Sequence, residues 1–189
     1  MPATRACLLA VCGLALSLAS EAAEFERAEI GFEGSTYHYT FIARLAAPAA
    51  QVRAVVTDFD GMGRINDNIR EARVLARYDD GSLKRVLKLR QCVLLICFNM
   101  DFVERVRALP QGVEALMLPA ESSFRDGTSA WTIEALDAAH ARVTVTARQT
   151  PRFWIPPLLG PAILKRVFLE EVTESCANIE KLALAAAAP

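Results

Sequence analysis

The chain has 189 residues, of which 53% are hydrophobic and 23% are charged, and its formal net charge is -1. This length and composition predict one domain with its own core and argue against a disordered chain. The near-zero net charge argues against a strongly basic nucleic-acid binder and against a general attraction to anionic membranes, although it leaves room for a local basic patch.

The first 22 residues have the pattern of a secretory signal peptide. Arg5 precedes an apolar run over residues 6–16, and Ser20 and Ala22 supply the small side chains that a signal peptidase recognises. A short membrane anchor is the alternative, but the run is shorter than the ~20 residues that a spanning helix needs. We therefore expect cleavage and a mature protein that is periplasmic or secreted.

The mature chain begins with β-like sequence over residues 25–45, within which Gly34-Ser35 suits a turn. A short helix over residues 49–57 follows, then a turn-rich break and a short helical turn near Ile65. A meander of about six strands comes next, and its sequence contains no βαβ repetition, which predicts an antiparallel sheet. The predicted strands are residues 69–77, 83–91, 98–109, 113–118, 127–136 and 141–150.

The longest helical pattern runs from residue 161 to residue 186, after an apolar, proline-rich lead-in that begins at Pro151. Its apolar positions recur at steps of three and four, and charged residues occupy the opposite face. The stripe consists of Leu164, Phe168, Val172, Cys176, Ile179 and Ala183. A lone amphipathic helix at the end of a β-rich chain must lay this stripe on the sheet, so we expect an α+β fold.

This layout resembles the START-like helix-grip superfamily, also called SRPBCC or the polyketide cyclase/dehydrase and lipid-transport group. The similarity is carried by residues 47–60, by the late strand around Trp131, and by residues 153–161 leading into the terminal helix. It covers residues 25–186. The resemblance implies a curved antiparallel sheet of about six or seven strands wrapped on the C-terminal helix, two short helices after the first strand, and a cavity between sheet and helix. It says little about the ligand, because members differ widely and some are enzymes.

We predict that bulky sheet residues and the helix stripe line this cavity, with Trp154 at its rim; the alternative is that the same residues fill an ordinary core. The predicted ligand-binding residues are Phe98, Met100, Phe102, Glu104, Met117, Trp131, Trp154, Leu164, Phe168 and Val172. Alternation assigns most other charged strand residues to the outer face. Glu104 is the exception, since it shares a face with Phe102, and burial there would require a partner.

Cys92 and Cys97 flank four apolar residues between two predicted strands. Across a four-residue hairpin loop their Cα atoms approach the ~5.5 Å that a disulfide needs. We predict a disulfide that closes a hairpin tip; the alternative is a continuous strand with two packed thiols. Cys176 is expected to be buried and free. The apolar tip and Trp154 suit a membrane or a partner, unless the proline-rich segment seals the mouth of its own cavity.

No motif for a metal site, a nucleophile or a nucleotide is present, so we predict no cofactor and no catalytic residue. The leading hypothesis is a monomeric periplasmic domain that binds or carries a lipid- or quinone-like hydrophobic molecule and contacts no nucleic acid. A cyclase or dehydratase acting on a polyketide-like substrate is the first alternative, and it would need Glu104, Asp58 or Tyr39 to point inward. A protein-interaction module is the second.

Overall fold

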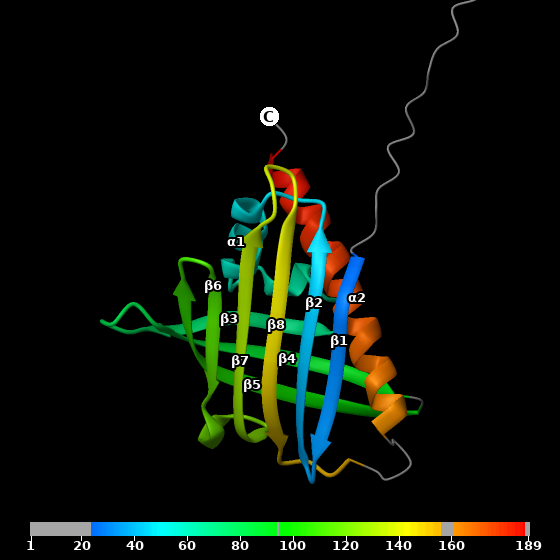
Figure 1. Ribbon diagram of the computed structural model, residues 1–189. Coiled ribbons are helices and arrows are strands. Elements are labelled where there is room, and N and C mark those ends of the chain that lie inside the picture. The colour runs from blue at the N-terminus through cyan, green and yellow to red at the C-terminus, as the bar shows by residue number, and fades with distance from the viewer. Residues whose placement is uncertain (1–23, 94, 156–160, 188–189) are drawn as a thin grey trace, which may run out of the picture.

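One antiparallel sheet of eight strands, in the order β1-β2-β8-β7-β6-β5-β4-β3, curves around a long C-terminal helix in the computed structural model (Figure 1). The structure describes residues 24–93, 95–155 and 161–187. The strands are β1 (Glu24–Glu33), β2 (Thr36–Leu45), β3 (Ile69–Arg77), β4 (Leu83–Val93), β5 (Ile96–Leu109), β6 (Gly112–Met117), β7 (Phe124–Ala135) and β8 (Ala141–Pro151). The helices are α1 (Ala49–Thr57), α2 (Pro161–Ala187) and the short 3-10 turns η1 (Met62–Arg64) and η2 (Pro119–Glu121).

The predicted fold class is confirmed, with two differences. The sheet has eight strands rather than six or seven, because the segment before β2 pairs with it as a separate edge strand through a turn at Gly34. Gly34 has a φ of 60°, which glycine adopts without steric cost. The two short helices therefore follow the second strand, and η1 begins slightly earlier than the helical turn predicted near Ile65.

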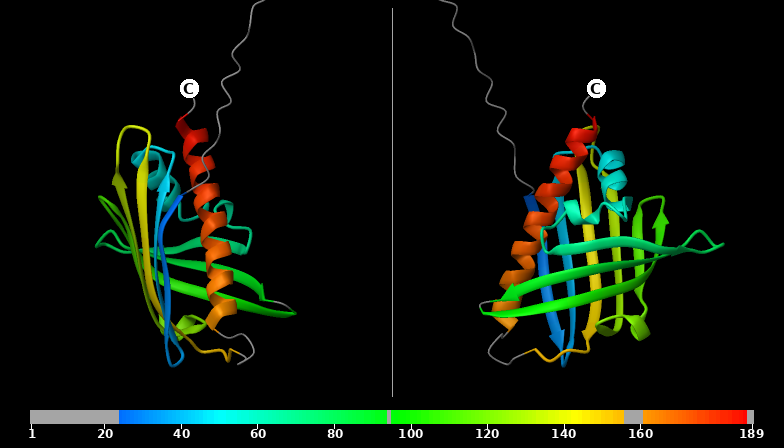
Figure 2. Two further views of the ribbon diagram at one scale, coloured as in Figure 1. Left: turned by 45° about the vertical axis from the view of Figure 1, so that its right-hand side comes forward. Right: turned by 180° about the vertical axis from the view of Figure 1, so that it is seen from behind.

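Alternation along the strands separates a dry face from a wet one. In β2, Phe41, Ala43 and Leu45 are buried, and in β8 Val143 and Val145 are buried opposite them. The intervening residues face the outside of the curve. The dry face is concave, and α2 lies across it (Figure 2).

The two halves of α2 are held differently. In the C-terminal half, Ile179 and Ala183 are fully buried against α1 and the end of β2, and the Glu180 carboxylate accepts a 2.7 Å hydrogen bond from the Ala46 backbone N–H. In the N-terminal half, stripe residues such as Leu164 are only partly buried. The predicted signal peptide lies outside the described residues. Within those residues, no helix has the length and apolar character needed to cross a bilayer.

Candidate functional site

A cavity of about 280 Å³ lies between the concave face of the sheet and α2. Its wall is mostly apolar and aromatic, and the polar groups on it come from a few positions in β2, β4, β5, β7, β8 and α2 and from the segment after η1. The aromatic side chains contact one another: the ring centroids of Phe168 and Tyr37 are 5.1 Å apart, and those of Phe168 and Tyr39 are 5.6 Å apart. A concave, mostly apolar wall with few polar groups is the usual form of a small-molecule site.

Eight of the ten predicted ligand-binding residues lie on this wall. They are Phe98, Met100, Phe102, Glu104, Trp131, Leu164, Phe168 and Val172. The apolar stripe of the helix and the alternate strand residues that face it therefore meet at one cavity. Ligand binding by these side chains stays a prediction.

The other two predicted residues do not line the wall. Met117 has the right parity, since it pairs with Glu104 across the β5–β6 ladder, but it is buried beside Phe124 and its sulfur accepts a hydrogen bond from Ser122 Oγ at 2.9 Å. Trp154 is 73% exposed. Its neighbours Phe153 and Ile155 line the cavity instead, because side chains one position apart in an extended segment point in opposite directions.

A buried ion pair forms the main polar feature of the wall. Arg85 and Glu104 face each other across the β4–β5 ladder, and both are almost fully buried. Arg85 donates from Nε and Nη2 to Glu104 Oε2 at 3.0 and 2.9 Å. Arg85 therefore belongs to the inner face, and it is the partner that burial of Glu104 requires. The Arg85 guanidinium also lies 5.4 Å from the centre of the Phe59 ring.

Two tyrosines add hydroxyl groups to the same wall. Tyr37 donates a hydrogen bond to the side-chain oxygen of Gln149. Burial, and next the nearby Glu104 carboxylate, raise the pKa of Tyr39 well above its ordinary value. Tyr39 is therefore protonated at neutral pH and is available as a hydrogen-bond donor. The sequence carried a signal for these residues, since Tyr37, Tyr39 and Phe41 alternate in one strand.

A polar clasp joins the segment after η1 to α2 at the edge of the cavity. Asn66 Nδ2 donates to Glu171 Oε2 at 2.8 Å and to Ser175 Oγ at 3.1 Å, and Asn68 Nδ2 donates to Glu171 Oε1 at 2.7 Å. Both oxygens of the Glu171 carboxylate are thus occupied. No sequence pattern indicated these contacts, because the partners are more than 100 residues apart.

The hairpin between β4 and β5 ends beside the mouth of the cavity. The predicted disulfide joins Cys92 and Cys97, which face each other across the ladder. Strand pairing continues one step further, to Val93 and Ile96, so the turn is shorter than the predicted four-residue loop. Val93 lines the cavity, whereas Leu95 is 99% exposed. The disulfide therefore fixes a tip whose end is apolar and solvent-facing.

The family model described as "Polyketide cyclase / dehydrase and lipid transport" matches residues 45–173, which is more than half of the chain. The chain belongs to this family. A search of curated proteins finds no match to the sequence.

Solved structures share the fold of this family member. A START superfamily protein from Mycobacterium smegmatis is 19% identical, with a TM-score of 0.62 over 79% of this chain and 98% of the other. The ZhuI aromatase/cyclase from Streptomyces sp. R1128 is 16% identical, with a TM-score of 0.63 over 81% and 96%. Human STARD10 is 12% identical, with a TM-score of 0.57 over 83% and 73%. At these identities the likeness shows the fold alone. The fold suggests hydrophobic ligand binding, and these neighbours include a cyclase as well as START proteins.

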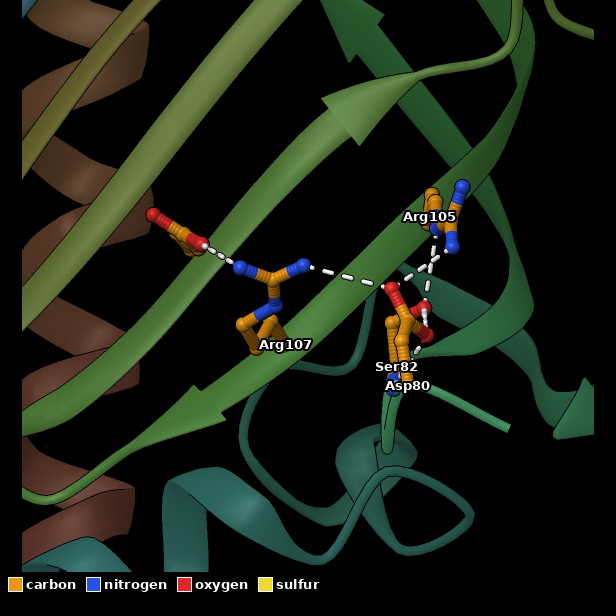
Figure 3. A network of polar contacts seen from close by, with 5 residues as sticks. Asp80, Ser82, Arg105 and Arg107 are labelled. Carbon is orange, nitrogen blue, oxygen red and sulfur yellow. Dashed lines mark hydrogen bonds and ion pairs between the residues drawn. The ribbon is translucent and has the colours of Figure 1, made fainter. Parts of the chain in front are cut away.

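A second, larger hollow of about 700 Å³ lies on the outer face of the sheet and is lined mainly by polar residues. At its edge, Asp80 accepts hydrogen bonds from the Ser82 backbone N–H and hydroxyl, which together with Arg105 and Arg107 lower the pKa of Asp80 to about 2 (Figure 3). Arg107 also lies 3.7 Å from Glu114. These charged groups compensate one another, so they point to structure rather than to a ligand.

Metal chemistry finds no support in the part of the chain that the structure describes, where no three His, Cys, Asp or Glu side chains gather closely enough to hold an ion. Cys176 is buried in α2 and forms no disulfide. Burial, and next the Glu180 carboxylate, raise the pKa of the Cys176 thiol to about 12, so this thiol is neutral and unreactive at neutral pH.

Proposed function

We propose that this protein binds and carries a hydrophobic small molecule, lipid- or quinone-like, in the cavity between the sheet and α2, and that it does so in the periplasm after export. The observation that carries the proposal is the cavity itself. Beneath the C-terminal half of α2 the core is closely packed around Ile179 and Ala183, whereas about 280 Å³ beside Phe168 is not filled by side chains. A void of this size loses packing energy, and a bound apolar ligand restores it.

The volume limits the ligand. A cavity of 280 Å³ lies just below the range of about 300–1,000 Å³ that is usual for ligand sites. A single ring, or part of one acyl or isoprenoid chain, fits this space. A two-chain phospholipid requires α2 to move away from the sheet.

The polar groups suggest which end of the ligand enters. Arg85 and Glu104 neutralise each other, and the other carboxylate among the described lining residues, Glu171, accepts hydrogen bonds from Asn66 and Asn68. Tyr39 is a donor as well. A neutral oxygen acceptor, such as a carbonyl, ester or hydroxyl group, matches these donors and brings no unpaired charge into an apolar space. The rest of the ligand then lies against Phe168 and Phe102.

An enzymatic role is the alternative, and the wall gives it less support. The wall carboxylates of Glu104 and Glu171 are each held by a hydrogen-bonded partner, Arg85 and Asn66 respectively. Tyr39 remains protonated and so does not serve as a base at neutral pH. A cyclase or dehydratase needs a group that moves a proton between substrate positions, and in this arrangement each candidate is already engaged in holding the fold or in donating.

Native mass spectrometry of the exported protein after gentle purification tests the proposal, with organic extraction to identify any released molecule. We expect an additional mass that extracts into organic solvent and that corresponds to one chain or one ring system. A protein that carries no extra mass, and that also fails to take up added fatty acids, isoprenoid alcohols or quinones, would remove the proposal.

A further inference from the structure

Apolar side chains from two segments far apart in the sequence are exposed at the cavity mouth. Leu95, at the end of the β4–β5 hairpin, is 99% exposed, and Trp154, after β8, is 73% exposed. The two segments are in contact, because the ring centroids of Phe98 and Phe153 lie 5.5 Å apart. Phe98 follows the disulfide and Phe153 precedes Trp154, so both exposed side chains project from one packed rim.

The end of the β4–β5 hairpin, which forms one side of the rim, is held in place by a disulfide. The Cys92–Cys97 disulfide crosses the hairpin directly behind the tip, and Val93 is buried on the inner side of the same hairpin. Within the part of the chain that the structure describes, Leu95 is 99% exposed, so the tip presents this side chain to solvent. Exposed apolar side chains that gather on one rim, as Leu95 and Trp154 do, are a feature of interaction surfaces.

Basic side chains surround the rim. Arg90 lies two residues before Cys92, Arg152 lies two residues before Trp154, and Lys165 and Arg166 lie in the first turns of α2; all four are exposed. Leu164, beside Lys165, lines the cavity, which places the start of α2 at the same mouth. Arg166 is paired with Glu170, and the Arg152 guanidinium donates to the Phe124 and Pro119 carbonyls at 3.2 and 3.0 Å, so of these four groups Arg90 and Lys165 carry most of the charge that is available at the mouth. The whole chain has a net charge of only -1, and this concentration of positive charge is therefore local.

We propose that this rim is a docking surface for a lipid bilayer that contains anionic phospholipid. The tip at Leu95 enters the acyl boundary, Trp154 lies at the headgroup level, where tryptophan is enriched, and the basic residues contact lipid phosphates. A narrow projecting tip beside a single tryptophan suits a deformable lipid surface better than the broad, flat contact that a protein partner needs. Docking in this orientation turns the cavity mouth toward the acyl chains.

This proposal rests on the proposed function in one respect: docking would serve to deliver the ligand. Docking itself can be measured without any ligand. The purified protein is sedimented with vesicles of phosphatidylethanolamine and phosphatidylglycerol, and separately with vesicles of phosphatidylcholine alone. We expect binding to the anionic vesicles that weakens as salt is added. Loss of one buried leucine contact should lower the partition coefficient of Leu95→Asp by about tenfold or more.

A matched control separates docking from a general loss of apolar surface. Leu116 on β6 is 51% exposed and lies on the outer face of the sheet, away from the mouth. Leu116→Asp introduces the same chemical change and should leave vesicle binding within about twofold of the unmodified protein, as expected of a side chain that stays in water. Equal loss in both variants, or no loss in Leu95→Asp, overturns the proposal. So does an unmodified protein that does not bind anionic vesicles.

Quenching of tryptophan fluorescence by brominated phospholipids tests the orientation. The unmodified protein should be quenched, and Trp154→Phe, which retains only Trp131 on the cavity wall, should be quenched much less. Uptake of a phenylnaphthylamine dye measures the cavity separately. Vesicle binding without dye uptake retains the docking surface and rejects the proposed function, whereas dye uptake without vesicle binding does the reverse.

Discussion

Replacing Glu104 with alanine tests whether the cavity wall is as dry as its geometry indicates. The change leaves the Arg85 guanidinium, which is 6% exposed, without the carboxylate that accepts its hydrogen bonds at 2.9 and 3.0 Å. Removing one partner of a buried ion pair typically costs about 3–5 kcal/mol, because the remaining charge stays desolvated. A domain has about 5–15 kcal/mol of stability in total, so this loss is a large fraction of it.

The assay is urea unfolding at neutral pH, followed by tryptophan fluorescence. Glu121→Ala is the matched control: Glu121 also pairs with a single basic side chain, Lys84, at 2.6 Å, but it is about half exposed. An exposed pair contributes about 0–1 kcal/mol. The double variant Arg85→Met with Glu104→Leu removes both charges and should be at least as stable as the original, to within about 1 kcal/mol.

The comparison of the two alanine variants decides the outcome. If Glu104→Ala costs no more than Glu121→Ala, the ion pair is hydrated through the cavity, and the argument for a dry wall is refuted. If Glu104→Ala is strongly destabilised but the double variant is not rescued, the pair performs a structural role that apolar packing does not replace.

Three further predictions concern the disulfide, the cavity and the buried thiol. Replacing Cys92 and Cys97 with serine should lower the free energy of unfolding by about 2 kcal/mol on the chain-entropy estimate for so short a loop; an unchanged urea midpoint under non-reducing conditions contradicts this. Val172→Phe should occupy part of the cavity, reduce dye uptake and keep the melting temperature, whereas Val143→Phe, in the filled core, should cost about 1–3 kcal/mol. Equal destabilisation would mean that there is no cavity. Burial raises the pKa of the Cys176 thiol in the folded protein from 9.0 to about 12. The stability that the neutral, buried thiol contributes is therefore complete below pH 9.0 and is lost as the pH rises toward 12. Alkylation of Cys176 in mildly alkaline buffer should be far slower in the folded protein than in urea.

Much of the fold follows from sequence periodicity. Alternation in β2 and β8 and the stripe on α2 each identified a buried face, and the resemblance supplied the way in which these faces meet. The turn residues Gly34-Ser35 already indicated two strands within residues 25–45, but charged residues such as Glu29 and Glu33 interrupt the apolar pattern of β1, and its place at the sheet edge depends on pairing with β2.

The site was less predictable for a physical reason. Parity assigned Glu104 to the inner face but did not identify Arg85 as its partner, because the pairing depends on the register of β4 against β5. The clasp between Asn66 and Glu171 depends on contacts across 105 residues of sequence, which no local pattern encodes. Met117 shows the limit of an argument from alternation: it pairs with Glu104 across the β5–β6 ladder, yet it packs beside Phe124 and does not line the cavity.

The C-terminal half of α2 is held more firmly than its N-terminal half, so the helix can tilt about its C-terminal end. Ile179 and the Glu180–Ala46 hydrogen bond hold the C-terminal half, while the half that contains Leu164 lies partly over the cavity. Tilting about the fixed end would separate Phe168 from Tyr37 and break the hydrogen bonds of Glu171 to Asn66 and Asn68, so these contacts set the energetic cost of widening the mouth. Backbone amides near residue 165 should therefore exchange with solvent faster than those near residue 179.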